Sequence, residues 1–121
     1  MPRDDSVYVG HMLDTARKAA EKIRGVTRAQ YDADENLRLA LTHLLQVIGE
    51  AARGVSDEFR ERNPEIPWQA IVGMRHRVVH DYLNVDEDVV WRTATNELMP
   101  LLRQLETIFP CQEDEHRDPA T

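Results

Sequence analysis

Apolar residues recur at steps of three and four through most of this chain, which is the spacing of one face of an α-helix. No stretch shows the strict alternation of a half-buried strand, and no internal repeat or glycine-rich phosphate loop is present. The pattern predicts four main helices: residues 6–24, a second from just after Asp32 or Asp34 to about Gly54, residues 67–80, and residues 87–109.

Short polar segments connect the predicted helices. Ser56 suits the N-cap of a short connecting helix that ends before Pro64, and residues 84–86 are predicted to form a turn and an N-cap. Pro100 lies inside the last predicted helix, where it removes one backbone hydrogen bond, so we expect a kink near Asn96. The sequence therefore predicts an all-α bundle of four main helices plus a short connecting helix.

The composition is that of one soluble domain. The chain has 121 residues, is 41% hydrophobic and 31% charged, and holds no apolar run of the length that crosses a bilayer or directs secretion. Its single cysteine, Cys111, excludes an intrachain disulfide and a multi-cysteine zinc site. These features predict a cytoplasmic protein with no membrane partner. We expect residues 1–110 to form the domain and residues 111–121 to be a disordered acidic tail.

The net charge of −7 argues against a broad nucleic-acid-binding surface. One segment differs, because residues 75–82 (Arg-His-Arg-Val-Val-His-Asp-Tyr) bring cations, candidate bases and a phenol together. On a helix, Arg75 and Tyr82 fall on nearly the same face, whereas His80 lies roughly 140° away from Arg75. Arg75 and His80 can therefore meet only if the helix ends near Val79 or if a second copy of the chain completes the site.

This set of side chains suits the cleavage of RNA without a metal ion or another cofactor. The reaction needs a base for the 2′-hydroxyl proton, which histidine supplies, and a cation for the phosphate, which the planar guanidinium of arginine supplies. His80 is the candidate base and Arg75 the candidate phosphate clamp. His76 is a candidate second acid or base, and Tyr82 could orient the phosphate or stack on a base.

Other interpretations of the same residues stay open. Arginine and histidine are common at helix C-termini because they interact favourably with the helix dipole. Arg77 and Asp81 could form an ordinary ion pair one helical turn apart. His76 and His80 have a spacing that could hold a metal ion, although the glutamate of a His-Glu-x-x-His motif is missing.

The segment also resembles the Arg-x4-His-x-Tyr motif of HEPN ribonucleases, specifically those of the HepT-like family. The resemblance covers roughly residues 5–109 and follows the family's order through Ile48-Gly49-Glu50-Ala51-Ala52, Pro64-Glu65-Ile66-Pro67-Trp68, the motif, Val85-Asp86 and Trp91. It implies an HEPN-type helical bundle that pairs as a homodimer, with the two motifs facing each other across a cleft.

The resemblance also implies roles for residues and partners. Arg75 and His80 would be the catalytic pair of an endoribonuclease toxin, for which tRNA or mRNA is the expected substrate. His76 fills the polar position after the motif arginine. Tyr82 matches a tyrosine that a minimal nucleotidyltransferase antitoxin of the MntA type modifies with adenylate.

Residues outside the catalytic pair are candidates for supporting roles. Arg77 and Asp81 lie inside the motif. Glu50 could orient an arginine of the site, or it could lie on a solvated or dimer-facing flank. The neighbouring glycine, Gly49, is expected to permit a close approach between helices. The tryptophans are expected to pack in the core or in an interface rather than to stack on bases.

Two other functions compete with the ribonuclease toxin. One is a non-catalytic helical module that binds a nucleotidyltransferase or a nucleotide and regulates it. The other is a pair in which the nucleotidyltransferase is the toxic partner and this chain restrains it. The complete set of Arg75, His80 and Tyr82 favours the enzyme, whereas the net acidity favours the binding module.

Overall fold

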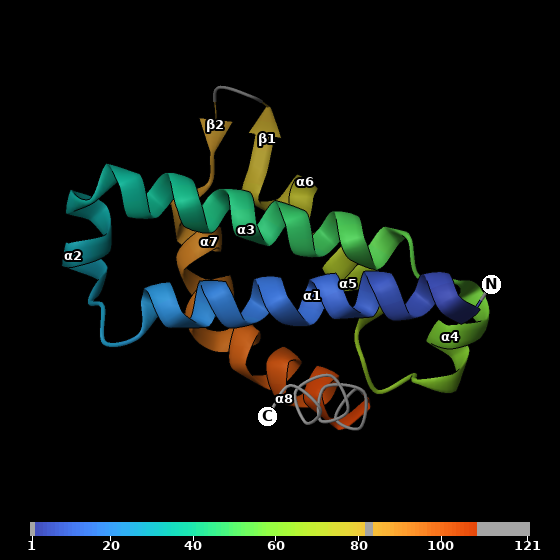
Figure 1. The fold of residues 1–121 in the computed structure, drawn as a ribbon. Helices are drawn as coiled ribbons and strands as arrows, with labels where there is room; N and C mark the ends of the chain where they lie inside the picture. Colours follow the sequence, from blue (N-terminus) through green and yellow to red (C-terminus); the bar gives the residue numbers. More distant parts are fainter. Residues whose placement is uncertain (1, 82–83, 109–121) are drawn as a thin grey trace.

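Helices account for most of the described chain, in agreement with the apolar spacing. The computed structural model describes residues 2–81 and 84–108. Two long helices, α1 (Pro2–Ile23) and α3 (Glu35–Arg53), lie side by side, with the short helix α2 (Arg28–Ala33) between them in sequence (Figure 1). Beyond α3, the chain continues through three more short helices: α4 (Asp57–Arg62), α5 (Trp68–Val72) and α6 (Met74–Val78).

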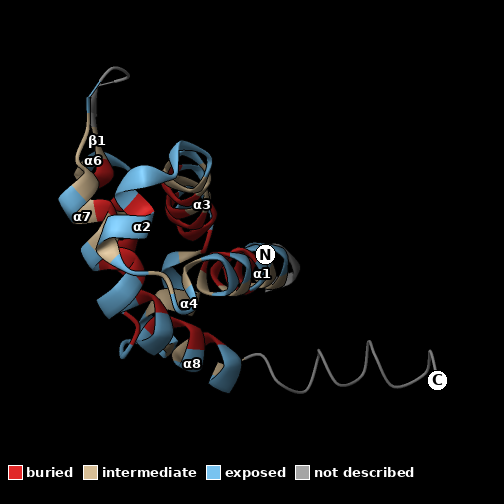
Figure 2. Ribbon diagram, turned by 90° about the vertical axis from the view of Figure 1, so that its left-hand side faces the viewer, coloured by how far each residue is buried: buried red, intermediate tan, exposed pale blue. Residues whose placement is uncertain are grey.

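A small antiparallel hairpin follows α6. It consists of β1 (Val79–Asp81) and β2 (Asn84–Val85), and both strands project from the helical body in the two views of Figures 1 and 2. After the hairpin, α7 (Glu87–Arg92), the π-helix η1 (Thr93–Glu97) and α8 (Leu98–Ile108) form one bent, continuous rod.

The core lies between the long helices and the segments that cover them. α8 packs against α1, whereas α5 and α6 pack against α3. In Figure 2 the buried positions lie on the sides of the helices that face one another. α1, α3, α6 and α8 supply many of the side chains that have almost no exposed surface: Val9, Met12, Leu13, Leu41, Leu45, Ile48, Val78, Leu98 and Leu105. Within the described ranges, no helix has the length and apolar character needed to span a membrane.

Several helix ends follow local signals in the sequence. Asp34 caps α3 by accepting a hydrogen bond from the Leu37 amide at 3.0 Å, and Ser56 caps α4. α1 ends just before Gly25, whose φ of 71° lies in the left-handed region that favours glycine. A π-helical turn, η1, lies where Pro100 was expected to disturb the last predicted helix.

Three sequence predictions about the elements were wrong. Residues 28–33, predicted as part of a connection, form α2. The third predicted helix does not continue to His80, because it is divided at Gly73 and ends at Val78, after which the backbone is extended. Residues 84–85, predicted as a turn, pair with β1 as a strand.

Candidate functional site

Arg75 is exposed because the opposite face of its short helix is anchored in the core. Met74 and Val78 of α6 lie one helical turn apart and are both buried. Between them, Arg75 and His76 are exposed and Arg77 is partly buried. The helix therefore displays the cations of the motif on the protein surface.

α3 approaches α5 and α6 very closely at Gly49. A Cβ atom at this position would lie 3.0 Å from the carbonyl oxygen of Ile71 and 3.6 Å from the amide nitrogen of Arg75. A Cβ atom at 3.0 Å would be closer to this carbonyl oxygen than an ordinary van der Waals contact, so the predicted role of Gly49 in close helix packing is confirmed. The close approach also brings the next residue of α3, Glu50, within reach of Arg75.

Glu50 binds the motif arginine directly. Nη1 of Arg75 donates a hydrogen bond to Oε2 of Glu50 at 2.6 Å, and Nη1 of Arg53 lies 3.9 Å from the same oxygen. All three side chains are about half exposed or more, so these ion pairs contribute only about 0–1 kcal/mol each to stability. Their main effect is to fix where the Arg75 guanidinium lies. The sequence named Glu50 as a candidate but gave no role to Arg53.

Arg77 has a partner that the sequence did not indicate. Its Nη2 lies 3.2 Å from Oε1 of Glu97 in η1. Because α6 ends at Val78, Arg77 and Asp81 do not lie one helical turn apart on one helix, and the side chain of Asp81 lies outside the described part of the chain. Arg77 instead joins the end of α6 to the bent rod that follows the hairpin.

His80 lies on the hairpin and not on the helix. Val79 is opposite Val85 and Asp81 is opposite Asn84, so the backbone of His80 is the extra residue of a β-bulge. The helix end at Val78 thus meets one of the two conditions under which Arg75 and His80 can approach each other. The side chains of His80 and Asp81, and the whole of Tyr82, lie outside the part of the chain that the structure describes.

A buried contact supports the base of the hairpin. The hydroxyl of Tyr31 in α2 donates to the carboxylate of Glu87, the first residue of α7. Burial, and then the hydrogen bond to Glu87, raise the pKa of Tyr31 well above its ordinary value. The amide of Asp86 donates to the carbonyl of Val78 at 2.8 Å, which ties the start of α7 to the end of α6. The bond from Asp86 to Val78 therefore joins the two ends of the hairpin, and α2 contacts α7 beside it through Tyr31.

Both tryptophans pack within the protein, as predicted. Trp68 is buried, and its Nε1 donates to the carbonyl oxygen of Asn63 at 2.9 Å. The ring of Trp91 is partly buried, with its centroid 5.4 Å from that of Tyr31. These rings stabilise the elements around the site and leave the polar chemistry to the residues on α3, α6 and β1.

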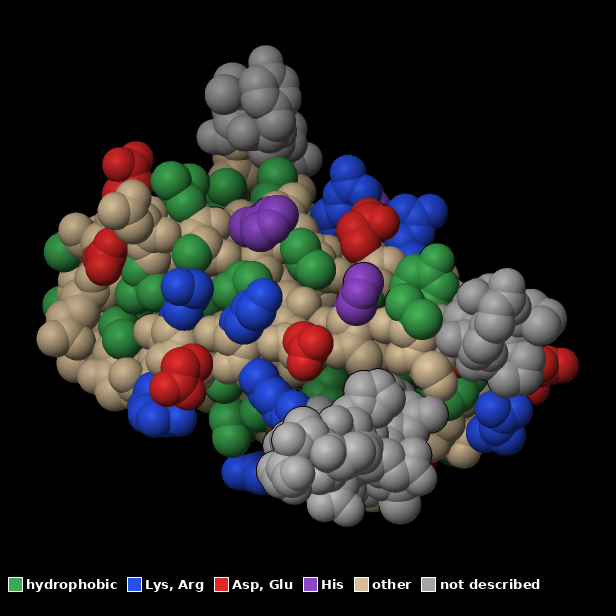
Figure 3. Space-filling view, in the orientation of Figure 1, with side chains coloured by type: hydrophobic (Ala, Val, Ile, Leu, Met, Phe, Trp, Pro, Cys, Tyr) green, Lys and Arg blue, Asp and Glu red, His purple; other side chains and the backbone are tan. Residues whose placement is uncertain are grey.

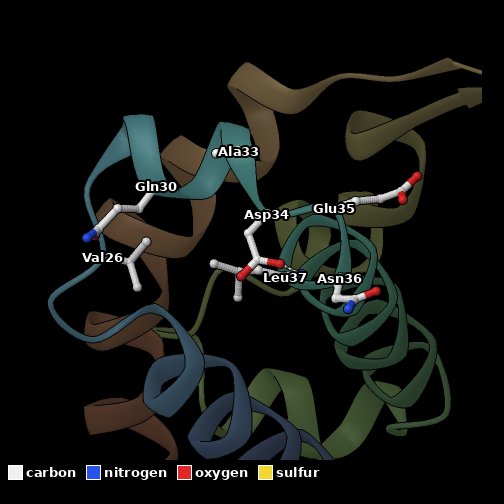
Figure 4. A pocket seen from close by; sticks show the side chains of 7 residues that line it. All are labelled: Val26, Gln30, Ala33, Asp34, Glu35, Asn36 and Leu37. Atoms are coloured by element: carbon white, nitrogen blue, oxygen red, sulfur yellow. Dashed lines mark hydrogen bonds between the residues drawn. The ribbon is translucent and has the colours of Figure 1, made fainter.

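A hollow of about 640 Å³ lies away from the motif, between α2 and the start of α3 (Figure 4). Its charged lining residues, Asp34 and Glu35, are both acidic, and Asp34 is the cap of α3. This lining repels phosphate, and the hollow is at the opposite end of α3 from Glu50. The hollow is therefore separate from the candidate site.

The family of the chain follows from its sequence match. A family model described as ribonuclease HepT-like matches residues 12–108, a span that contains α3, α6, the hairpin and α7. The chain belongs to the HepT-like family. The match includes every element that carries a candidate site residue.

Relatives of this HepT-like chain are named as ribonucleases. A candidate RNase of Methanocaldococcus jannaschii is 34% identical over 112 residues, which are 93% of this chain and 97% of the relative. A candidate RNase of Caldanaerobacter subterraneus is 32% identical over 102 residues, which are 84% and 91% of the two chains. The probable ribonuclease HepT of Thermococcus cleftensis is 27% identical over 108 residues, covering 89% and 98%. No solved structure gave a significant match.

Proposed function

We propose that this HepT-like chain is a metal-independent endoribonuclease that acts as the toxin of a toxin–antitoxin pair in the cytoplasm. The observation that carries the proposal is the position of Arg75. Its guanidinium is exposed on α6 and is held by Glu50, and Arg75 lies four residues before the start of the hairpin that carries His80. These residues lie within the span that matches the ribonuclease family.

The proposed reaction is an attack within the RNA strand. His80 takes the proton of a 2′-hydroxyl, and the resulting oxyanion attacks the adjacent phosphorus. The bond to the 5′-oxygen breaks, that oxygen takes a proton from His76 or from water, and a 2′,3′-cyclic phosphate remains. Arg75 stabilises the negative charge that builds up on the pentavalent phosphate. Each step uses side chains and water, so the reaction needs no metal ion.

We include a homodimer in the proposal. Because α6 ends at Val78, no straight helix keeps Arg75 and His80 apart, and their approach does not require a second copy of the chain. The support comes instead from the family resemblance and from the hairpin, which projects from the helical body (Figure 1). Two projecting hairpins related by a two-fold axis would each reach the motif of the partner.

We also propose that a nucleotidyltransferase antitoxin of the MntA type controls the enzyme by attaching adenylate to Tyr82. The added phosphate would lie near the cations of the motif and would fill space that the RNA needs. The test is co-expression with a neighbouring nucleotidyltransferase, followed by mass mapping of the purified chain. Adenylate on Tyr82 together with loss of RNase activity supports this control. Full neutralisation of an active Tyr82→Phe variant contradicts it.

The toxin proposal is tested by expressing the chain alone from an inducible promoter, beside the His80→Ala variant at an equal level. The wild-type chain should arrest growth and shorten tRNA or mRNA, and the variant should do neither. Growth arrest that persists in His80→Ala contradicts a catalytic toxin. Binding of a nucleotidyltransferase or a nucleotide by a wild-type chain that cleaves no RNA would instead support a regulatory binding module.

A further inference from the structure

The site contains a cation outside the motif. Arg53 is the last residue of α3, and its Nη1 lies 3.9 Å from the Glu50 oxygen that also accepts the 2.6 Å hydrogen bond from Arg75. The two guanidinium nitrogens are therefore no farther apart than the sum of these two distances. We refer to Arg53, Glu50 and Arg75 as the arginine cluster. Although Glu50 lies between the two cations, the cluster has a net positive charge.

The usual reason for an arginine at a helix C-terminus does not apply to Arg53. Such residues commonly bind the last carbonyl groups of the helix. In α3 this task belongs to Arg60, whose Nη2 donates to the carbonyls of Ala52 at 3.0 Å and Arg53 at 3.4 Å. The side chain of Arg53 is 63% exposed, and its distance from Glu50 is longer than a hydrogen bond. The guanidinium of Arg53 therefore faces solvent without fixing the helix end.

The region of the cluster is more positive than the chain as a whole. In Figure 3, Lys or Arg side chains gather around one acidic side chain, over the region where Figure 1 shows α6 and the C-terminal half of α3. The net charge of the whole chain is −7, so this local group is the exception. Guanidinium groups bind phosphate oxygens through two parallel hydrogen bonds, which makes a pair of nearby arginines a good match for a polyanion.

We propose that Arg53 and Arg75 bind two neighbouring phosphates of one single-stranded RNA. Arg75 takes the phosphate that is cleaved, and Arg53 takes the next phosphate along the strand. Glu50 holds the two cations close together before RNA arrives, and its longer, weaker contact with Arg53 is the one that gives way to phosphate. This inference rests on the proposed ribonuclease function, and it adds a substrate-binding residue that lies outside the motif.

Because Arg53 and Arg75 bind different phosphates, removing one or the other should change different kinetic constants. A phosphate next to the cleaved one carries the same charge in the bound substrate and in the transition state. Removing a contact to it weakens both states equally, which raises KM and leaves kcat unchanged. Removing Arg75, by contrast, should lower kcat.

The experiment compares Arg53→Gln with a matched control, Arg24→Gln, in the full-length chain. Arg24 pairs with Glu21 three residues earlier, as Arg53 does with Glu50, and is 75% exposed. The carboxylate of Asp5, near the start of α1, binds Ser56 just beyond the end of α3. Arg24 follows the other end of α1, so it lies far from the cluster. Cleavage kinetics are measured on a single-stranded oligonucleotide. Binding is measured at several salt concentrations in a His80→Ala background.

For Arg53→Gln we expect KM to rise about 3- to 10-fold, kcat to stay within about twofold, and binding to weaken uniformly across RNA sequences. The slope of log Kd against log salt should fall by about 0.7, the value for one phosphate of a single strand. Arg53→Lys should keep most of that slope. Arg24→Gln should match the parent, and equal thermal midpoints will show that all variants are folded.

The possible outcomes separate this inference from the proposed function. If Arg53→Gln has the same KM and the same salt slope as the parent protein, the inference is overturned. The proposed function still stands in that case, provided that the parent protein cleaves RNA. A loss confined to kcat, or an equal loss in Arg24→Gln, also overturns the inference. A parent protein that neither binds nor cleaves RNA overturns the proposed function and this inference with it.

Discussion

At the scale of single residues, the sequence predicted the motif around Arg75 but not the contacts that Arg75 makes. The spacing of Arg75, His80 and Tyr82 is visible in the sequence, so the candidate chemistry followed from residue types alone. Glu50 could not be assigned in the same way, because its contact with Arg75 joins residues that are 25 positions apart. That contact depends on how closely α3 packs against α6. Arg53 was missed for the same reason, although its position three residues after Glu50 was a usable signal.

Replacing Glu50 tests whether it positions Arg75. Glu50→Gln keeps the size of the side chain but removes its charge, so the guanidinium of Arg75 loses its fixed partner. We expect kcat for RNA cleavage to fall about 10-fold, by analogy with the loss of other positioning contacts. The free energy of unfolding should change by less than about 1 kcal/mol, because the pair is half exposed. A rise in kcat would show that the carboxylate competes with phosphate instead.

At the scale of elements, local signals were predictable and non-local pairing was not. α3 and α4 were found because apolar spacing and N-caps are encoded by neighbouring residues. α1 was found from its apolar spacing alone, and it begins at Pro2 rather than at residue 6. α2 is too short to repeat an apolar face, although the capping box of Thr27 and Gln30 marks its start. The hairpin was missed because strands of three and two residues show no clear alternation. Its existence changes the site, since it moves His80 off the helix.

The contact between α3 and the motif-bearing helices can be tested at Gly49. In an open helix, Gly→Ala stabilises by about 1 kcal/mol. At Gly49 the new methyl group would meet the carbonyl oxygen of Ile71 at 3.0 Å, so we expect Gly49→Ala to lower the free energy of unfolding instead, and Gly49→Val to lower it further. Urea unfolding at constant m-value measures both. A stabilised Gly49→Ala variant would contradict the close packing described for α3.

The Tyr31–Glu87 contact predicts a dependence of stability on alkaline pH. Burial raises the pKa of Tyr31 in the folded chain above the unfolded value of about 10. The resulting stabilisation is complete below pH of about 10 and is lost as the pH rises towards the folded pKa. The free energy of unfolding of the wild type should therefore fall more steeply above pH of about 10 than that of Tyr31→Phe. Parallel curves for the two proteins would show that Tyr31 is not held in its neutral form.

At the scale of the whole molecule, the central question is whether one copy or two make a site. The sequence suggested a shared site because it assumed one straight helix through residue 80, and that assumption was wrong. The homodimer now depends on the family resemblance and on the projecting hairpin. Light scattering should give about twice the chain mass of 14.0 kDa.

Mixing two inactive variants tests whether the site is shared between copies. Equal amounts of Arg75→Ala and His80→Ala are unfolded together and refolded, so that mixed dimers form. If each site takes Arg75 from one copy and His80 from the other, a mixed dimer has one intact site, and activity should return to about a quarter of the wild-type value. If each copy forms its own site, both sites of a mixed dimer are damaged and activity should stay at the level of the variants.

The most direct test of the account is the cleavage of a defined RNA in excess EDTA, with the ends of the products identified by mass spectrometry. The wild-type chain should cleave and leave a 2′,3′-cyclic phosphate. Because removing a general base typically costs 10²–10⁴ in rate, His80→Ala should be nearly inactive while keeping the helical circular dichroism of the wild type. A strict requirement for a divalent metal, or a folded His80→Ala variant with wild-type activity, would contradict the proposed mechanism.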